Sequence, residues 1–259
     1  MKKILLTLLA IIAILLHLSC KKIIEQLHHN PGEEFKYGDI KMIKVWFNDS
    51  YNEFTFSYNN KGQPKDVIGK YPDSPWHYWS VDQHFRYDKQ GRLTDWITNP
   101  PGQQHVWTWS TFHYLSPTKV LDSTYGGWGF ESLITDEHPF YFSKTTPLLV
   151  RVLDFDNYGR IIRAALPDGS SPSVFVYDAN GNSNAYPSYD SAVNIMRTNK
   201  IWMFVNFNYN VNNYNSRNGI HYSYNTYLLP TEITFSYPYG EQFMTAFVAN
   251  KLAIEYDCH

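Results

Sequence analysis

The sequence predicts an all-β protein, built as one twisted antiparallel meander of short hairpins. Its 259 residues include 21 Tyr, 16 Phe and 8 Trp, and aromatic side chains favour the pleated, half-buried surface of a sheet. Apolar and polar residues alternate along several stretches, as in strands with one buried face. A short unit that is clearest at residues 85–96 recurs along the chain. We therefore expect a sheet that gains strands with each unit, either extended or curled toward an open barrel or half-pipe.

The recurring unit is an aromatic residue, then Asp or Asn, two variable positions, usually Gly, and a second strand. Its copies begin, from the closest match to the loosest, at Tyr87, Phe155, Tyr177, Tyr58, Tyr114 and Tyr224. Glu255-Tyr256-Asp257 resembles the start of one more copy. Asp and Asn side chains can cap their own loop and Gly accepts a positive φ, so each copy predicts a hairpin. We expect stability to rest on these capped hairpins and on cross-strand aromatic pairs rather than on helices.

The N-terminus has the order of an export signal. Two Lys residues precede an apolar run from Ile4 through Leu16, which is shorter than the roughly 20 residues of a membrane span. Leu18-Ser19-Cys20 resembles the end of a bacterial lipoprotein signal. This resemblance implies a signal peptide over 1–19, a lipid on Cys20 and a location in the cell envelope; an ordinary export signal with a chance Cys is the alternative. We expect a tether over 20–36 and a single β domain over 37–259.

Within the β domain, regular alternation begins at residue 40, where Ile43, Val45 and Phe47 share the more apolar face while Ile40 lies on the other. Longer connections interrupt the meander at 69–80, 126–147 and 184–199. Residues 200–209 are the most apolar stretch of the mature chain. We expect them to form a central strand that is buried on both faces near its start, followed by an Asn-rich loop.

Charge and cysteine content exclude some classes of protein. Removing residues 1–19 takes two Lys from a chain that already has more acidic (24) than basic (22) residues, so no basic stripe predicts nucleic-acid binding. Once Cys20 carries lipid, Cys258 has no second Cys with which to form a disulfide.

Two resemblances extend these predictions. The copies at Tyr87 and Phe155 resemble the YD repeats of RHS-type bacterial surface and toxin proteins, which implies hairpin units. The chain is also similar, over nearly all of its mature length, to a group of uncharacterised Bacteroidota-type lipoproteins. The residues that carry this second likeness are Ser19–Lys22, Phe85–Asp88, Arg92–Asp95, Arg197–Phe204, Tyr209–Asn213, Leu229–Thr231 and Ile254–Cys258. It implies an outer-membrane lipoprotein but no chemistry.

The best candidate for a binding site is the aromatic stretch at residues 103–113. If it is one strand, His105, Trp107, Trp109 and His113 share a face, because strand side chains alternate. Flat rings beside hydrogen-bonding groups suit a sugar ring or a base. Alternatively, both Trp residues cover the core and the His residues lie at the strand ends in water.

Signals for catalysis or metal binding are weak. The residues His77, His84, His105 and His113 have no short ligand spacing, and residues 178–182 look like a calcium loop without its distal Glu. There is no nucleophile elbow, phosphate-binding loop or His-Glu-x-x-His motif. We therefore expect no catalytic residue, metal or cofactor, although two carboxylates brought together across a cleft would suffice for glycoside hydrolysis.

These patterns predict a lipid-anchored envelope protein that binds a glycan or an envelope partner through aromatic surface. Two alternatives stay open: a structural or interaction protein without a small-molecule ligand, and a glycan-active hydrolase.

Overall fold

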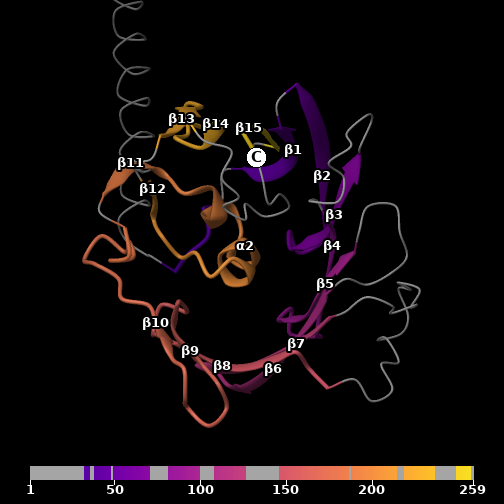
Figure 1. The fold of residues 1–259 in the computed structure, drawn as a ribbon, viewed down its shortest axis with the longest axis vertical. Coiled ribbons are helices and arrows are strands. Elements are labelled where there is room, and N and C mark those ends of the chain that lie inside the picture. Colours follow the sequence, from indigo (N-terminus) through magenta and orange to yellow (C-terminus); the bar gives the residue numbers. More distant parts are fainter. Residues whose placement is uncertain are drawn as a thin grey trace, which may run out of the picture.

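The structure is a computed structural model that describes residues 32–35, 38–47, 49–70, 81–99, 108–126, 146–186, 188–214, 219–236 and 249–257. In this part of the chain, thirteen strands form one antiparallel sheet and two form a separate ribbon. The sheet is not closed into a barrel, because its two end strands do not pair with each other: β10 pairs with β9, and β13 pairs with β14. Figure 1 shows the strands in an arc around one short helix. The predicted all-β meander is confirmed.

Ten strands follow one another across the sheet in chain order. They are β1 Asp39–Phe47, β2 Ser50–Tyr58, β3 Pro64–Lys70, β4 Asp82–Tyr87, β5 Leu93–Asn99, β6 Thr108–Ser116, β7 Lys119–Gly126, β8 Leu149–Phe155, β9 Ile161–Ala165 and β10 Ser173–Val174. A second series continues the sheet from β1 in the order β15, β14, β13. Its members are β13 Ile220–Tyr224, β14 Pro230–Phe235 and β15 Lys251–Asp257. The chain's first and last described strands are therefore neighbours.

The β15–β1 pair is one repeat unit divided between the two ends of the sequence. In the unbroken hairpins at Tyr58, Tyr87, Phe155 and Tyr224, the aromatic residue pairs with the residue six positions later, and the register then skips one residue. Tyr256 pairs in the same way with Ile40, and the register skips Lys41. The bulge puts Ile40 on the core face with Ile43 and Val45, so the expectation that Ile40 lies on the opposite face is wrong.

The hairpin loops have the predicted capping. In the loop after Tyr87, the amide of Gly91 donates to the carbonyl of Asp88 at 2.9 Å, and the amide of Arg92 donates to Asp88 Oδ1 at 2.9 Å. Gly91 has φ +80°. Equivalent bonds close the loops that follow Tyr58, Phe155, Tyr177 and Tyr224. The Tyr114 copy differs, because Ser116 pairs directly with Lys119 in a shorter turn.

Tyrosine hydroxyls join each unit to the neighbouring one in the sheet. Tyr87 donates to the carbonyl of Pro64 at 2.6 Å, and Pro64 is the residue paired with the aromatic of the preceding unit. The equivalent carbonyl accepts from Tyr58, Tyr177 and Tyr256. We call this series the tyrosine ladder. Phe155 lacks the hydroxyl, and Tyr224, whose strand β13 ends the sheet, donates to Asp190 instead.

An insert, residues 175–214, connects β10 to β13 across the concave side of the sheet. It contains β11 Tyr189–Val193, a 3₁₀ turn η2 Ile195–Thr198, the helix α2 Lys200–Val205 and β12 Asn212–Tyr214. The two strands β11 and β12 pair with each other and lie near the opening of the arc in Figure 1.

The expected central strand at residues 200–209 is wrong, because this stretch begins with α2. The side chain of Asn199 caps the helix by accepting a hydrogen bond from the amide of Ile201 at 3.1 Å. All residues from Ile201 to Val205 are buried, so the helix shows no polar face. Periodicity cannot distinguish such a buried helix from a buried strand.

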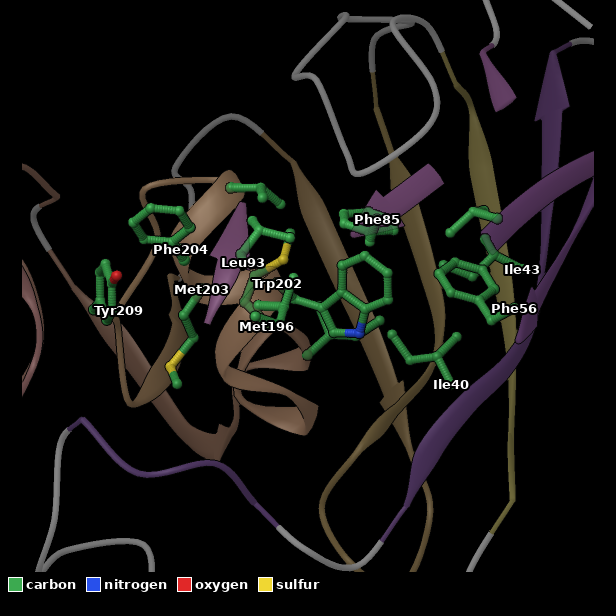
Figure 2. Packing of buried hydrophobic residues seen from close by; sticks show 14 of the residues in the cluster. Ile40, Ile43, Phe56, Phe85, Leu93, Met196, Trp202, Met203, Phe204 and Tyr209 are labelled. Carbon is green, nitrogen blue, oxygen red and sulfur yellow. The ribbon is translucent and has the colours of Figure 1, made fainter. Parts of the chain in front are cut away.

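The helix lies at the centre of the main hydrophobic core. Trp202, only 1% exposed, packs edge-on against Phe56 and Phe85, with ring centroids 5.5 and 5.3 Å away. Figure 2 shows its indole between these rings and near Ile40. Phe204 contacts Phe112 at 4.8 Å in the same core. The expectation that stability rests on hairpins and aromatic pairs rather than on helices stays a prediction, although α2 packs against the inner aromatics of successive hairpins.

A short N-terminal strap, residues 32–35, packs against the insert. The amide of Phe35 donates to the carbonyl of Arg197 at 2.5 Å, and Arg197 Nε donates to the carbonyl of Glu33 at 3.3 Å. Burial lowers the pKa of Arg197 to about 10, opposed by the charge of Glu33. Phe35 is buried with Val193 and Leu229. Part of the predicted tether therefore contacts the folded domain.

Candidate functional site

Two residues of the sequence-predicted site lie on the outer face of the sheet. His105, Trp107 and Cys20 lie outside the described residues. Trp109 and His113 belong to strand β6, which begins at Thr108. Phe112 faces the core, and by alternation Trp109 and His113 face away from it. Trp109 is half-buried and stacks on Tyr125 at 5.2 Å, and its Nε1 donates to Asp95 Oδ1 at 2.9 Å. His113 is exposed.

A cavity of about 380 Å³ lies elsewhere, between the two ends of the sheet. On one side it is lined by Phe175 and Tyr177, which follow β10. On the other it is lined by residues of β13 and β14, including Tyr222 and Phe235, while the insert supplies the rest of the wall. We call this cavity the edge pocket. Its size is typical of a small-molecule site.

Aromatic rings form much of the edge-pocket wall. Tyr186 and Tyr214 stack with ring centroids 4.3 Å apart and an interplanar angle of 16°, and Tyr186 is 39% exposed. Tyr222 stacks on Tyr224 at 5.9 Å. Burial raises the pKa of Tyr222, and the charge of Asp190 raises it further, so its hydroxyl remains a hydrogen-bond donor at neutral pH.

Asparagine side chains supply the polar part of the wall. Those lining the pocket are Asn194, Asn206, Asn208, Asn210 and Asn213. Most of them also fix the insert's irregular backbone: Asn210 Oδ1, for example, accepts from the amide of Ser183 at 2.6 Å. Asn206 differs. Its Nδ2 donates to the carbonyl of Trp202 at 2.9 Å, whereas its Oδ1 accepts no hydrogen bond from the described residues, so this oxygen is available to a ligand.

Phe207 lines the pocket in a strained backbone conformation. Its φ is +53°, a region that bulky residues rarely adopt and that costs about 1–3 kcal/mol. The ring lies 6.1 Å from that of Phe175, and the guanidinium of Arg151 lies over it at 4.7 Å. Such strain persists where the surroundings enforce it, commonly at binding sites.

The edge pocket could not be predicted as a unit because its residues come from three separate segments. The available signal was the sequence NFNYNVNN at residues 206–213, in which amides alternate with aromatic or apolar residues. Because these residues directly follow the buried helix α2, their amide and aromatic side chains lie close to the same cavity. The prediction from apolar content instead assigned residues 200–209 to a strand and only the later part to an Asn-rich loop.

Comparisons with known proteins add no assignment. No protein-family model matches the chain, and no curated protein does so either. In the described ranges, no helix is long and apolar enough to cross a membrane. The same ranges contain no group of three or more His, Cys, Asp or Glu side chains that could hold a metal ion.

Proposed function

We propose that the protein is a lipid-anchored component of the cell envelope, located at the outer membrane, whose β domain binds a glycan in the edge pocket. The observation that carries the proposal is the composition of the pocket wall, which combines stacked tyrosines with carboxamides in one cavity.

Sugars have two kinds of surface that this wall complements. The C–H face of a pyranose ring packs on an aromatic ring, and Tyr186 and Tyr214 offer such a surface at the exposed side of the pocket. Sugar hydroxyls both donate and accept hydrogen bonds, as do carboxamides such as Asn206. A few well-placed polar groups in a mainly aromatic pocket are the usual basis of ligand specificity.

The envelope location rests on the N-terminal sequence. Cys20 follows an export-like signal, and acylation at this residue would anchor the chain without a spanning helix. The strap that follows it in the sequence already contacts the domain at Glu33. A Cys20→Ala variant should lose incorporation of labelled fatty acid and should leave the membrane fraction. Retention of both would contradict the anchor.

Glycan binding can be tested with arrays and calorimetry on the purified full-length protein. Tyr186→Ala and Tyr214→Ala should each weaken binding by about tenfold, the loss of roughly 1.4 kcal/mol of stacking. Tyr158→Ala is the matched control, because this tyrosine is 56% exposed and does not line the pocket. Trp109→Ala tests the outer-face alternative. Binding that is lost in Trp109→Ala and kept in both pocket variants would place the site on β6.

A second candidate, an interaction protein without a small-molecule ligand, is favoured by the sheet edge. Val174 in β10 and the nearby Val176 are 65% and 55% exposed, and an end strand can pair with a strand from another chain. Isolation of complexes from cell envelopes tests this role. A stoichiometric partner that is lost in Val176→Pro would support it, with Tyr158→Ala again as control.

A further inference from the structure

Among the residues that the structure describes, those that line the edge pocket include no acidic, basic or histidine side chain. This observation extends the proposed function and rests on it, because it concerns the chemical class of the bound glycan. Charged residues nevertheless contact the pocket wall from behind: Arg151 lies over Phe207, Arg160 lies over Tyr177, and Asp190 accepts from the amide of Asn213. The partners of these charges influence the electric field that a ligand meets.

Two cations lie near the wall. Arg160 lies 4.2 Å from the ring of Tyr177, and its Nε donates to Asp156 Oδ2 at 2.8 Å. The other cation is Arg151. Its Nε and Nη2 atoms donate to Asp122 Oδ2 at 3.1 and 2.5 Å, and Asp122 is buried. The ring of Phe207 covers the guanidinium at 4.7 Å. Since Phe207 lines the pocket and Arg151 does not, the cation is paired with a carboxylate and separated from the cavity by an aromatic ring.

The nearby anion is Asp190 in β11. Its Oδ1 accepts hydrogen bonds from the amides of Ala192 and Asn213, at 2.9 and 3.2 Å. The hydroxyl of Tyr224 donates to Oδ2. Asn213 lines the pocket while Asp190 does not, so this carboxylate is also held by groups of the wall.

We infer that the edge pocket selects an uncharged saccharide, one whose bound units carry no carboxylate, sulfate or phosphate. A charged group that leaves water must find an opposite charge or several strong hydrogen bonds to offset its desolvation. The cavity provides amides, hydroxyls and rings, which suit neutral hydroxyl-bearing rings. Arg151 and Arg160 are paired with Asp122 and Asp156, and the carboxylate of Asp190 is held by three hydrogen bonds within the protein.

The test compares neutral and anionic oligosaccharides of equal length on the full-length protein. Cellohexaose, mannohexaose and xylohexaose represent the neutral class, and hexagalacturonate and a heparin hexasaccharide the anionic class. We expect at least one neutral probe to bind, with an affinity that is independent of salt concentration and at least about tenfold higher than that of either anionic probe. Anionic probes that bind as tightly or more tightly, with affinity that falls as salt rises, would overturn the inference and leave the proposed function standing. If no saccharide binds, the proposed function fails and the inference fails with it.

A variant that introduces a charge tests whether the preference for uncharged saccharides arises in the edge pocket. Ala185 lines the cavity and is exposed, so Ala185→Lys should be tolerated and should raise affinity for hexagalacturonate several-fold. The matched control is Ala179→Lys, at an exposed position in the 178–182 loop outside the pocket wall. An equal gain in both variants, or a gain in neither, would show that pocket charge does not set the preference and would contradict the inference.

Discussion

The hairpin meander and the insert are specified in different ways. Each hairpin is specified by a few neighbouring residues. In the loop after Tyr87, for example, Asp88 caps the loop and Gly91 adopts the positive φ that the turn needs. Beyond the capped loop that follows Tyr177, the insert contains no copy of this unit. Its path depends on Asn side chains that bond to distant backbone and on Trp202 fitting between rings of two hairpins. The repeating part of the molecule forms a regular concave scaffold. The insert adds the feature that the repeats lack, because it forms most of the edge pocket.

The largest expected effect comes from removing the packing contact between the insert and the hairpin meander. Trp202→Ala removes the largest fully buried side chain of the core, and should lower the free energy of unfolding by about 3–5 kcal/mol. Urea denaturation of the full-length protein measures it. Tyr158→Ala, at an exposed ring, should cost less than about 0.5 kcal/mol. A loss below about 1 kcal/mol in Trp202→Ala would show that the meander is stable without the insert.

The next effect tests whether each hairpin is locally specified. Asp88→Ala removes the acceptor of the Arg92 amide and the ion pair from Asp88 Oδ2 to Arg92 Nε. We expect a loss of about 1–2 kcal/mol, mostly from the cap, because the exposed ion pair contributes little. Thermal unfolding measures the loss, and Lys89→Ala in the same loop is the control. Equal effects of the two substitutions would contradict the capping role.

The tyrosine ladder can be tested by removing one of its hydrogen bonds and, separately, by adding one. Tyr87→Phe deletes the hydroxyl that donates to Pro64 and should cost about 1–2 kcal/mol. Phe155→Tyr places a hydroxyl where the ladder lacks one, with the carbonyl of Val120 as its acceptor by analogy with the other units. It should stabilise the protein by up to about 1 kcal/mol, measured by urea denaturation. A destabilised Phe155→Tyr would show that this unit departs from the ladder near Phe204, on which Phe155 stacks.

These two regions also explain what could be predicted from the sequence. The loops at Tyr87 and Phe155 were predictable because Asp and Gly act over four residues, and even the loop at Tyr224 was found although Leu228 takes the Gly position with φ +61°. The partner of Tyr256 was not found, because β1 lies at the other end of the chain. The helix at 200–205 was mistaken for a strand since its surroundings are apolar on every side. Its signal was Asn199, a good N-cap before an apolar run.

The site was less predictable than the fold. Alternation implies that Trp109 and His113 share a face of β6, but no sequence rule brings Tyr186, Tyr214 and Tyr222 together. Their meeting depends on the insert crossing from β10 to β13. A local code can therefore reveal the scaffold, whereas a pocket assembled from distant segments needs the tertiary structure.

The smallest expected effect is the pH dependence of the meander itself. Asp66 Oδ1 lies 2.8 Å from His84 Nδ1, linking β3 to β4. Burial raises the pKa of Asp66, but hydrogen bonding and charge from His84 outweigh it, so the net pKa lies below the ordinary value of an Asp side chain. A carboxyl group with a lowered pKa binds its proton less tightly in the folded state. Its contribution to stability is therefore present above about pH 4 and is lost as the pH falls through the folded-state value.

Asp66→Asn should remove this acid sensitivity. Between pH 6 and pH 3, urea denaturation should show a smaller loss of stability in the variant than in the wild type, by less than about 1 kcal/mol because the pair is partly exposed. Asp49→Asn, at an exposed turn between β1 and β2, should keep the wild-type dependence. If Asp66→Asn and the wild type lose stability equally on acidification, the Asp66–His84 contact does not link these hairpins. The loss of stability on acidification could not then be assigned to the buried pair of Asp122 in β7 and Arg151 in β8. There burial raises the carboxyl pKa despite the opposing charge of Arg151, so the expected change has the opposite sign, with stability gained as that carboxyl is protonated.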